Sequence, residues 1–568
     1  MTLKEYLEQA ILKIVSELGY PTDNAMVTIS NRPDLSDYQS NISMSLARSA
    51  RKAPRIIADE IKAKLSDDEN FKSVTVDGPG FINVSFSDKY LLNVSSAHAF
   101  SNKKIVLDYG GPNIAKEMHV GHLRSAIIGE SLKRILRFCG DEVVGDVHLG
   151  DWGTPMGMLI NQLKQEDPKL FESEENAENF EMDIAEISAL YRRAAANFKQ
   201  SDEFKDQARF ATFELQNNNK IYRILWQIMK EKSVEAINEN YKKLDVKFDV
   251  WLGESDTNDL LPEIVCDLLE RNIAVRSEGA VIVPIFENGE EKAPLILQKS
   301  DNAYTYAITD IATIIQRKKS FSPDAILYVV DARQSEHFKQ VFEVARRAGY
   351  ISENVLLEHI AFGTVNGKDG KPFKTRDGGV MNLSDLIALS ETKAKEGCED
   401  DGAKNIQEQV HQIAIGSLKF QDLKNVRTSN YIFDTENFTK SEGKTGAYIQ
   451  YAVARINSIL EKSSDTDFEN SELVITHPFE RELVLHLNRA EEYLYSAYAA
   501  REPSVICEYI FALAQKFSSF YAKLKINSEP DEKIRLSRQH LICLVRKQLI
   551  WGLYLLGIQA PESMSGRK

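Results

Sequence analysis

Hydrophobic and polar positions divide the first hundred residues into helices followed by strands. Apolar residues recur every three or four positions over residues 3–19 and 43–65, where Pro54 interrupts the pattern, so we predict helices there. Apolar and polar residues then alternate on both sides of the Gly78–Gly80 turn, which predicts two strands. We therefore predict a separate α+β domain over residues 1–98.

From residue 99 the pattern alternates between strands and helices. Residues 105–110 are apolar and lead into Gly-Gly-Pro, a helical pattern covers residues 123–138, and a second strand is predicted over residues 141–149. This order is typical of a parallel βαβ unit. Residues 161–250 are charged and helical without strand signals, so we predict a helical insertion there.

The second half of the α/β domain is predicted after a helix and a strand hairpin over residues 263–285. The pattern then predicts strand, turn, strand and helix over residues 293–317, and strand, loop and helix over residues 322–350. Beyond these, the chain is helical almost to its end. The fold class is therefore multidomain: an α+β N-terminal domain, an α/β Rossmann-like domain with a helical insertion, and an all-α C-terminal bundle. The predicted domain bounds are 1–98, 99–381, 382–440 for a helical connector, and 441–568.

Composition narrows the class of protein. The net charge of −14 argues against a protein that coats DNA, but not against an RNA partner bound by a local basic face. The five cysteines form no CxxC pair and no zinc-like spacing, so we expect reduced thiols and no structural metal. The acidic N-terminal stretch is unlike a signal peptide, and no run of about 18 apolar residues occurs. We expect a cytoplasmic protein without a membrane segment.

The turn before the helix at residue 123 carries the candidate chemistry. His119 and His122 are three residues apart, so we expect them to share a helix face, with Gly121 between them leaving room for a ligand and Lys116 just upstream. The N-terminus of a helix attracts anionic phosphates through its free N–H groups and its dipole. Two imidazoles and a lysine there suit a polyphosphate whose charge shifts during a reaction.

These residues resemble a known family. HVGH resembles the HIGH signature of class I aminoacyl-tRNA synthetases, and the longer run PNIAKEMHVGHLRS resembles bacterial-type arginyl-tRNA synthetases. GDWG, DYQSN and GPGFIN resemble the same family. The resemblance implies an arginine–tRNA ligase that uses L-arginine, tRNA(Arg) and ATP with Mg²⁺, acts as a monomer and needs bound tRNA for activation. It also implies that the N-terminal domain contacts the dihydrouridine loop of the tRNA.

Arginine recognition calls for carboxylates, because the guanidinium group presents a charged fork of donors. Asp108 lies at the end of a predicted strand and Asp310 lies after a later one. Tyr306 and Asp310 are four residues apart on one expected helix face. By resemblance, four residues match the arginine-binding positions of the family: Asn113, Tyr306, Asp310 and Gln334. Asp108 stands where the family places an acidic residue.

A glycine- and lysine-rich loop follows over residues 362–387. Its KPFKT run, Lys371 to Thr375, resembles the KMSKS signature, with Pro-Phe in place of Met-Ser. Lysines on such a loop can close over a pyrophosphate leaving group. The resemblance implies catalytic roles for His119, His122, Lys116 and Lys374, and ATP binding by His119, Gly121, His122, Lys371 and Lys374. Whether Lys116 or Lys374 contributes more stays open.

The predicted bundle begins with a helix that carries aromatic and basic residues. By resemblance this is the start of an anticodon-binding domain, and Tyr448, Tyr451 and Arg455 are candidates for stacking on unpaired bases. We expect one of the two tyrosines, not both, to touch RNA.

Two alternative functions stay open. Besides the arginine–tRNA ligase that the resemblance implies, the chain could be a HIGH-type nucleotidyltransferase that acts on a small acid without RNA, or a non-catalytic relative that only binds RNA. The helical C-terminal third disfavours the first, and the intact HVGH residues and lysines disfavour the second.

Overall fold

The N-terminal part of the chain is a four-stranded antiparallel sheet covered by helices. The structure is a computed structural model. It describes residues 1–22, 24–92, 100–367, 370, 381–396, 406–434, 436–465 and 467–564. The strands lie in the order β1-β2-β4-β3. The elements are α1 (Leu3–Glu17), β1 (Val27–Ile29), β2 (Tyr38–Ser40), α2 (Ile42–Ala50), α3 (Pro54–Leu65), β3 (Phe71–Asp77), β4 (Phe81–Phe86) and α4 (Asp88–Leu91). The predicted α+β class of this domain is confirmed.

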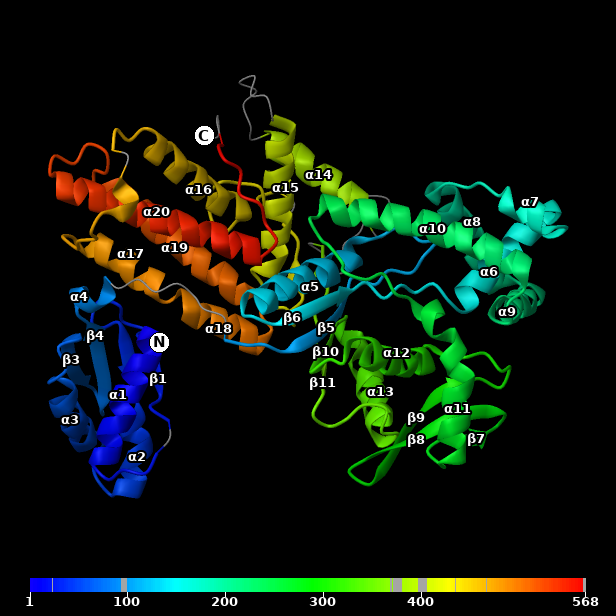
Figure 1. Ribbon diagram of the computed structural model, residues 1–568, viewed down its shortest axis with the longest axis horizontal. Coiled ribbons are helices and arrows are strands. Elements are labelled where there is room, and N and C mark those ends of the chain that lie inside the picture. The colour runs from blue at the N-terminus through cyan, green and yellow to red at the C-terminus, as the bar shows by residue number, and fades with distance from the viewer. Residues whose placement is uncertain are drawn as a thin grey trace.

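The centre of the molecule is a parallel sheet in the order β11-β10-β5-β6 (Figure 1). Its strands are β5 (Lys104–Tyr109), β6 (Glu142–Asp146), β10 (Ala325–Val329) and β11 (Leu356–His359). The helices that follow or precede them are α5 (Val120–Phe138), α12 (Tyr306–Phe321) and α13 (Ser335–Arg347), with the short η3 (Ala332–Gln334) before α13. Alternate residues of β5 enter different cores: Leu107 packs with α5, whereas Val106 packs with α12. The sheet therefore separates these two helices.

A second, antiparallel sheet stands beside the parallel one. It consists of β7 (Val275–Ser277), β8 (Ala280–Glu287) and β9 (Glu290–Gln298), preceded by η2 (Glu254–Leu260) and α11 (Leu261–Glu270). The strand predicted from residue 293 thus belongs to this sheet and not to the parallel one, because a tight turn ties β9 to β8. The further strand predicted before α12 is wrong, since Tyr304 makes only an isolated bridge to Gln298.

The predicted insertion is a helical subdomain at the far end from the N-terminal domain (Figure 1). Its helices are α6 (Thr154–Glu166), η1 (Pro168–Phe171), α7 (Glu174–Glu178), α8 (Ile184–Gln200), α9 (Asp202–Gln216) and α10 (Lys220–Lys243). They enclose their own apolar core, in which Trp152 of the GDWG run packs edge-on against Trp226 at 5.2 Å. After α10, residues 250–253 return to the sheet and form parallel bridges with the end of β6 and the turn that follows it.

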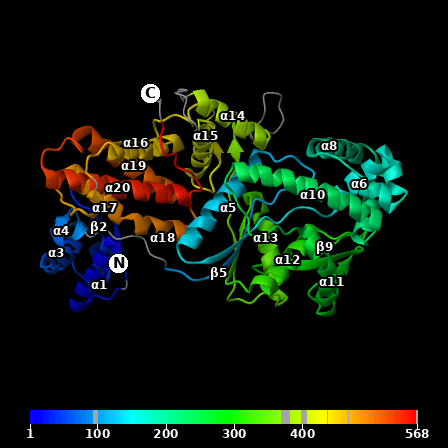
Figure 2. The ribbon, with the colours of Figure 1, turned by 45° about the horizontal axis from the view of Figure 1, so that its top comes forward.

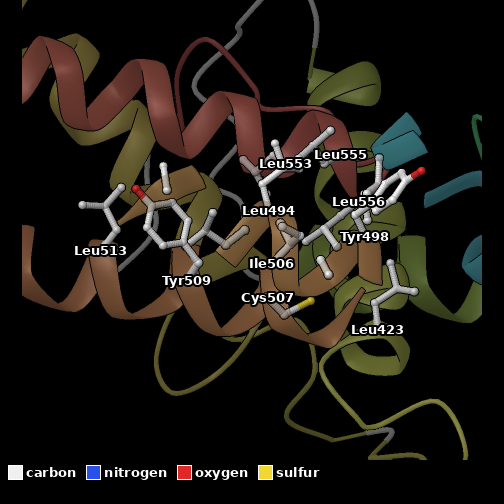
Figure 3. Packing of buried hydrophobic residues seen from close by; sticks show 14 of the residues in the cluster. Leu423, Leu494, Tyr498, Ile506, Cys507, Tyr509, Leu513, Leu553, Leu555 and Leu556 are labelled. Atoms are coloured by element: carbon white, nitrogen blue, oxygen red, sulfur yellow. The ribbon is translucent and has the colours of Figure 1, made fainter. Parts of the chain in front are cut away.

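The C-terminal part is an all-helical bundle, as predicted (Figure 2). The short strands β12 (Val365–Asn366) and β13 (Tyr431–Ile432) pair in parallel, and the chain forms two of the helices below, α14 and α15, between them. The helices are α14 (Leu383–Glu396), α15 (Ile406–Leu423), α16 (Gly446–Glu461), η4 (Phe468–Asn470), α17 (Pro478–Asn488), α18 (Ala490–Ala500), α19 (Ser504–Lys523) and α20 (Glu532–Leu555). Buried side chains such as Leu494, Ile506 and Leu553 interdigitate between α18, α19 and α20 (Figure 3).

An ion-pair network holds the N-terminal domain against the bundle. Arg481 of α17 pairs with both carboxylate oxygens of Asp37 at 2.8–2.9 Å, and its Nε lies 2.9 Å from Asp88. Arg489 donates to the backbone carbonyl of Asp37, and its guanidinium lies 4.9 Å from the centre of the Tyr38 ring. The first two residues of the DYQSN run are therefore explained by contact between domains.

Candidate active site

The HVGH turn forms the N-terminus of α5. The spacing predicts that His119 and His122 share a helix face, but only His122 lies within the helix. His119 is the N-cap residue with extended backbone, and its Nδ1 accepts the N–H of Gly121 at 3.0 Å. His122 reaches back, and its Nδ1 accepts the N–H of His119 at 3.1 Å. This reciprocal cap brings the two rings to 4.0 Å between centroids. The glycine is needed because a Cβ at Gly121 would meet the His119 ring at 2.7 Å.

Burial keeps both rings neutral, and the caps decide which nitrogen of each ring carries the proton. Burial lowers the pKa of His122 to about 3, and the nearby His119 adds to the effect. Partial burial, and then the charge of Lys116, lower the pKa of His119. Each neutral ring accepts through Nδ1, so each carries its proton on Nε2. Two neutral N–H donors are thus available at a helix N-terminus, where anions bind.

The segment before the turn contacts the helical insertion. The Lys116 ammonium group lies 4.7 Å from the centre of the Tyr191 ring on α8, and Glu117 is 4.0 Å from Arg192. On the other side, Asn382 donates to Glu117 at 2.9 Å, and the backbones of Val120 and Met381 are hydrogen-bonded. The turn is therefore clamped between the insertion and the chain that leads into α14.

A cavity of about 320 Å³ opens beside the HVGH turn. Its lining residues come from α5, from the end of β10 and from the segment before β12: His119, Val120, Gly121, Arg124, Asp331, Arg333, Phe362, Gly363, Thr364 and Val365. Arg124 is buried, lies 3.1 Å from Asp422 and donates to the carbonyl of Gly363 at 2.7 Å. Backbone groups and the Phe362 ring beside neutral imidazole donors at a helix N-terminus suit a nucleotide.

The predicted arginine-binding residues divide into an exposed group and a buried one. Tyr306 opens α12 and is 62% exposed, Gln334 is exposed at the end of η3, and Asn113 is exposed beside Gly150. Asp310 lies one turn after Tyr306, as the spacing predicts, and its Oδ2 is 2.5 Å from Nε2 of His337. The His337 ring packs 4.6 Å from the Tyr306 ring. Tyr306, Asp310 and His337 thus form one corner of the site.

Asp108 has a different surrounding from the one expected for a residue that contacts substrate. Its Oδ2 accepts a hydrogen bond from Nη2 of the buried Arg317 at 2.7 Å, and the same Nη2 lies 2.6 Å from Asp146. Burial raises the pKa of Asp108, which the positive charge of Arg317 partly opposes. The chain itself therefore supplies a guanidinium group to this carboxylate.

Glu254 is a candidate that the sequence reasoning missed. Burial and then the negative charges of Asp310 and Asp151 raise its pKa to about 8. Asp151 is already paired with Lys230 at 2.5 Å. Glu254 and Asp310 thus form a site that favours a cationic ligand. The available signal was a carboxylate after glycine in the WLGESD run, where the chain returns to the sheet.

The remaining predicted site residues are two lysines of the KPFKT run and three candidate tRNA-binding residues of the bundle. Lys371 and Lys374 lie outside the described residues. In the bundle, Tyr448 packs 5.7 Å from Phe511, and its hydroxyl is 3.0 Å from that of Ser518. The exposed Arg455 donates to the hydroxyls of Tyr451 and Tyr521, both at 3.1 Å. Tyr521 is a second candidate that the sequence reasoning missed, although it is an aromatic residue near the end of the amphipathic helix α19.

In the part of the chain that the structure describes, no group of three or more His, Cys, Asp or Glu side chains is placed to hold a metal ion. Within those same residues, no helix is both long enough and apolar enough to cross a membrane. Cys139, Cys266, Cys507 and Cys543 are free thiols.

Comparisons with known proteins cover nearly the whole chain. Residues 1–86 match the arginyl tRNA synthetase N terminal domain, residues 87–435 the catalytic domain of tRNA synthetases class I (R), and residues 449–564 the DALR anticodon binding domain. The arginine–tRNA ligase of Francisella tularensis subsp. tularensis is 41% identical over 99% of this chain and all of its own.

Solved structures agree with these matches. The arginyl-tRNA synthetase of Plasmodium falciparum superposes with a TM-score of 0.84 at 25% identity, over 99% of both chains. That of Thermus thermophilus shares the fold, with a TM-score of 0.79 at 24% identity over 99% of this chain and all of its own. The chain therefore belongs to the class I arginyl-tRNA synthetase family, whose members are arginine–tRNA ligases.

Proposed function

We propose that this chain charges tRNA with arginine in two steps at the edge of the parallel sheet. The residues around HVGH bind ATP, and residues of α12 bind arginine. The observation that carries the proposal is the juxtaposition at one sheet edge of a capped histidine pair beside a cavity and an acidic corner. His119 lines the cavity, and Asp310 and Glu254 make the corner. Ligands of open α/β sheets bind at this edge.

In the first step, an oxygen of the arginine carboxylate attacks the α-phosphorus of ATP, and the bond to the β-phosphate breaks. Arginyl-adenylate and pyrophosphate result. The Nε2–H groups of His119 and His122 stabilise the charge on the phosphates. Because both rings are neutral, they donate hydrogen bonds without giving up a proton. Positioning and electrostatic stabilisation suffice for this chemistry, and no side-chain nucleophile is needed.

Lys116, Lys371 and Lys374 are proposed to bind the departing pyrophosphate. The cation–π contact of Lys116 with Tyr191 supports a position beside the HVGH turn. ATP enters as its Mg²⁺ complex, since Mg²⁺ binds substrate phosphates and needs few protein carboxylates.

Asp310 and Glu254 are proposed to bind the guanidinium group, with Tyr306 over it and Asn113 and Gln334 at the α-amino and carboxylate end. Burial, and then repulsion from Asp310 and Asp151, raise the pKa of Glu254, and a cation between Glu254 and Asp310 would let both carboxylates ionise. Citrulline, which is neutral, would leave these carboxylates unpaired, and this accounts for selectivity without editing.

In the second step, a hydroxyl of the terminal ribose of tRNA attacks the adenylate carbonyl and AMP leaves. We propose that Arg455 with Tyr451 forms part of the anticodon surface, because their polar groups lie on the outside of the bundle. We further propose that the enzyme is a monomer and works in the cytoplasm, where its tRNA is used.

The test is ATP–pyrophosphate exchange with each amino acid in turn, with and without unfractionated bacterial tRNA. Exchange with arginine alone, dependent on tRNA, would support substrate and RNA coupling together. Exchange with another acid that ignores tRNA would favour a nucleotidyltransferase without RNA. ATP binding without any exchange would favour a binding-only relative. In the active case, His122→Ala should lower the exchange rate by about a hundredfold, the loss typical of one transition-state donor.

A further inference from the structure

We infer that Arg317 is a positioning residue. It holds the proposed arginine-binding residues of α12 in place, and it does so independently of the cavity beside His119 that is proposed to bind ATP. The inference rests on the proposed roles of Tyr306 and Asp310. Arg317 is fully buried on α12, and it touches three neighbouring strands of the parallel sheet at one level.

The strand register places its partners in a row. Tyr328 of β10 is the register partner of Asp108 of β5, and Asp108 is the partner of Asp146 of β6. Register partners on adjacent strands point to the same face of a sheet. Nη2 of Arg317 bonds both carboxylates at 2.6–2.7 Å, and its guanidinium carbon lies 5.3 Å from the centre of the Tyr328 ring. One side chain therefore joins α12 to three strands.

The contacts of Arg317 with the sheet determine where the residues at the start of α12 lie. Tyr306, Asp310 and Arg317 are spaced by four and seven residues, so they lie along one stripe of α12. Asp310 stands about 10 Å from Arg317 along the axis. A helix is stiff over two turns, so a shift where Arg317 meets the sheet moves Asp310 and Tyr306 with it.

The helix α5, which borders the proposed ATP cavity, is held by separate contacts on the other face of the sheet. Arg124 of α5 pairs with Asp422 of α15 and donates to the carbonyls of Gly363 and Ser429. Ser125 ties α5 to the ends of two strands by accepting from the N–H of Gly110 and donating to the carbonyl of Val329, both at 2.7 Å. None of these contacts passes through α12. Loosening Arg317 should therefore displace the arginine site and spare the cavity beside His119.

The same geometry gives Asp108 its role. Because Asp108 points to the α12 face and is bonded to Arg317, it holds the helix that carries the pocket. Lysine cannot replace Arg317 fully, since its compact ammonium group has no planar face to lie against the Tyr328 ring while it bonds the two carboxylates.

The experiment compares Arg317→Lys with Arg124→Lys by ATP–pyrophosphate exchange at saturating tRNA. We expect Arg317→Lys to raise the KM for arginine by about tenfold or more and to leave the KM for ATP within about twofold, since small misplacements weaken binding strongly. Arg124→Lys should do the reverse. Arg538→Lys is the matched control: Arg538 is a buried arginine paired with Glu480 and Glu529 inside the bundle, and its replacement should change neither KM.

Equal rises of both KM values in Arg317→Lys, or an unchanged KM for arginine, would overturn the inference. Asp310→Asn separates this failure from failure of the proposed pocket. If Asp310→Asn leaves the KM for arginine unchanged, the pocket is wrongly assigned and the inference falls with it. If Asp310→Asn raises that KM and Arg317→Lys does not, only the positioning role is wrong. Should Arg317→Lys not fold, Asp146→Asn retains Arg317 and one ion pair and must show the same selective rise.

Discussion

Nε2 of His337 lies 2.5 Å from Oδ2 of Asp310, although the two residues belong to different helices. The hydrogen bond joins α13 to α12 at the point where the proposed guanidinium pocket begins. It fixes which carboxylate oxygen of Asp310 remains free for a ligand.

Removing this hydrogen bond should weaken arginine binding. His337→Leu deletes the donor, and we expect the KM for arginine to rise by about tenfold, because a hydrogen bond to a charged group contributes about 1.5–3 kcal/mol. His337→Gln keeps a donor near the Nε2 position and should restore most of the loss. The measurement is pyrophosphate exchange at varied arginine. Equal KM values for the Leu and Gln variants would show that the hydrogen bond is unimportant.

Arginine binding should release a proton from Glu254. Its pKa, raised to about 8 by burial and then by Asp310, leaves it largely protonated at pH 7 in the free enzyme. A bound guanidinium lowers that pKa, so arginine affinity should rise as the pH increases from about 6 to 8. Titration calorimetry in buffers of different ionisation enthalpy measures the released proton. Glu254→Gln should abolish the proton release, and persistence of the release in that variant would refute the assignment.

The bundle should lose stability in mild acid through His486. This ring stacks 4.7 Å from Tyr509, and burial lowers its pKa to about 3. In the unfolded chain histidine titrates near 6.5, so between these values only the unfolded state binds the proton. The free energy of unfolding should therefore fall as the pH drops from about 6.5 towards 3, by up to about 1.4 kcal/mol per unit for this group.

The matched measurement is urea unfolding of the wild type and of His486→Gln across that range. At pH 8 the difference between the two proteins reports packing and the hydrogen bond of His486 to the carbonyl of Tyr509, because both side chains are neutral there. The difference should shrink as the pH falls, since the variant lacks the titrating ring. A constant difference from pH 8 to pH 4.5 would contradict the prediction.

The two tyrosines of α16 should differ in their effect on tRNA. Tyr451→Ala should weaken tRNA binding by about tenfold, as expected for one stacked base, and leave the KM for arginine unchanged. Tyr448→Phe removes only a hydroxyl bonded to Ser518 and should leave tRNA affinity unaltered. Filter binding at fixed salt checks both variants. Loss of affinity in Tyr448→Phe with none in Tyr451→Ala would reverse the assignment.

Short-range patterns were enough to predict the elements that carry the site. The strand at residue 105, the Gly-Gly-Pro turn and α5 follow from local periodicity, and HVGH therefore stands at a helix mouth in both the prediction and the structure. The spacing of Tyr306 and Asp310 likewise predicts their common helix face correctly. The period of 3.6 residues decides such relations within one helix.

Local patterns failed where partners come from distant parts of the chain. The sequence offers no sign that Asp108 meets Arg317, 209 residues later, or that Asp37 is paired with Arg481 of the bundle. The repulsion between Glu254 and Asp310 was equally hidden.

By itself, the sequence determined the multidomain class, the βαβ start of the catalytic domain and the position of the HVGH turn at a helix N-terminus, because these depend on neighbours within a few residues. Only the tertiary structure decided which carboxylates stay free for a ligand. Strand register sets Asp108 beside Asp146, and helix packing brings Arg317 onto both. A buried charge must be paired with an opposite charge nearby. Which residue supplies that opposite charge depends on packing and burial and not on spacing along the chain.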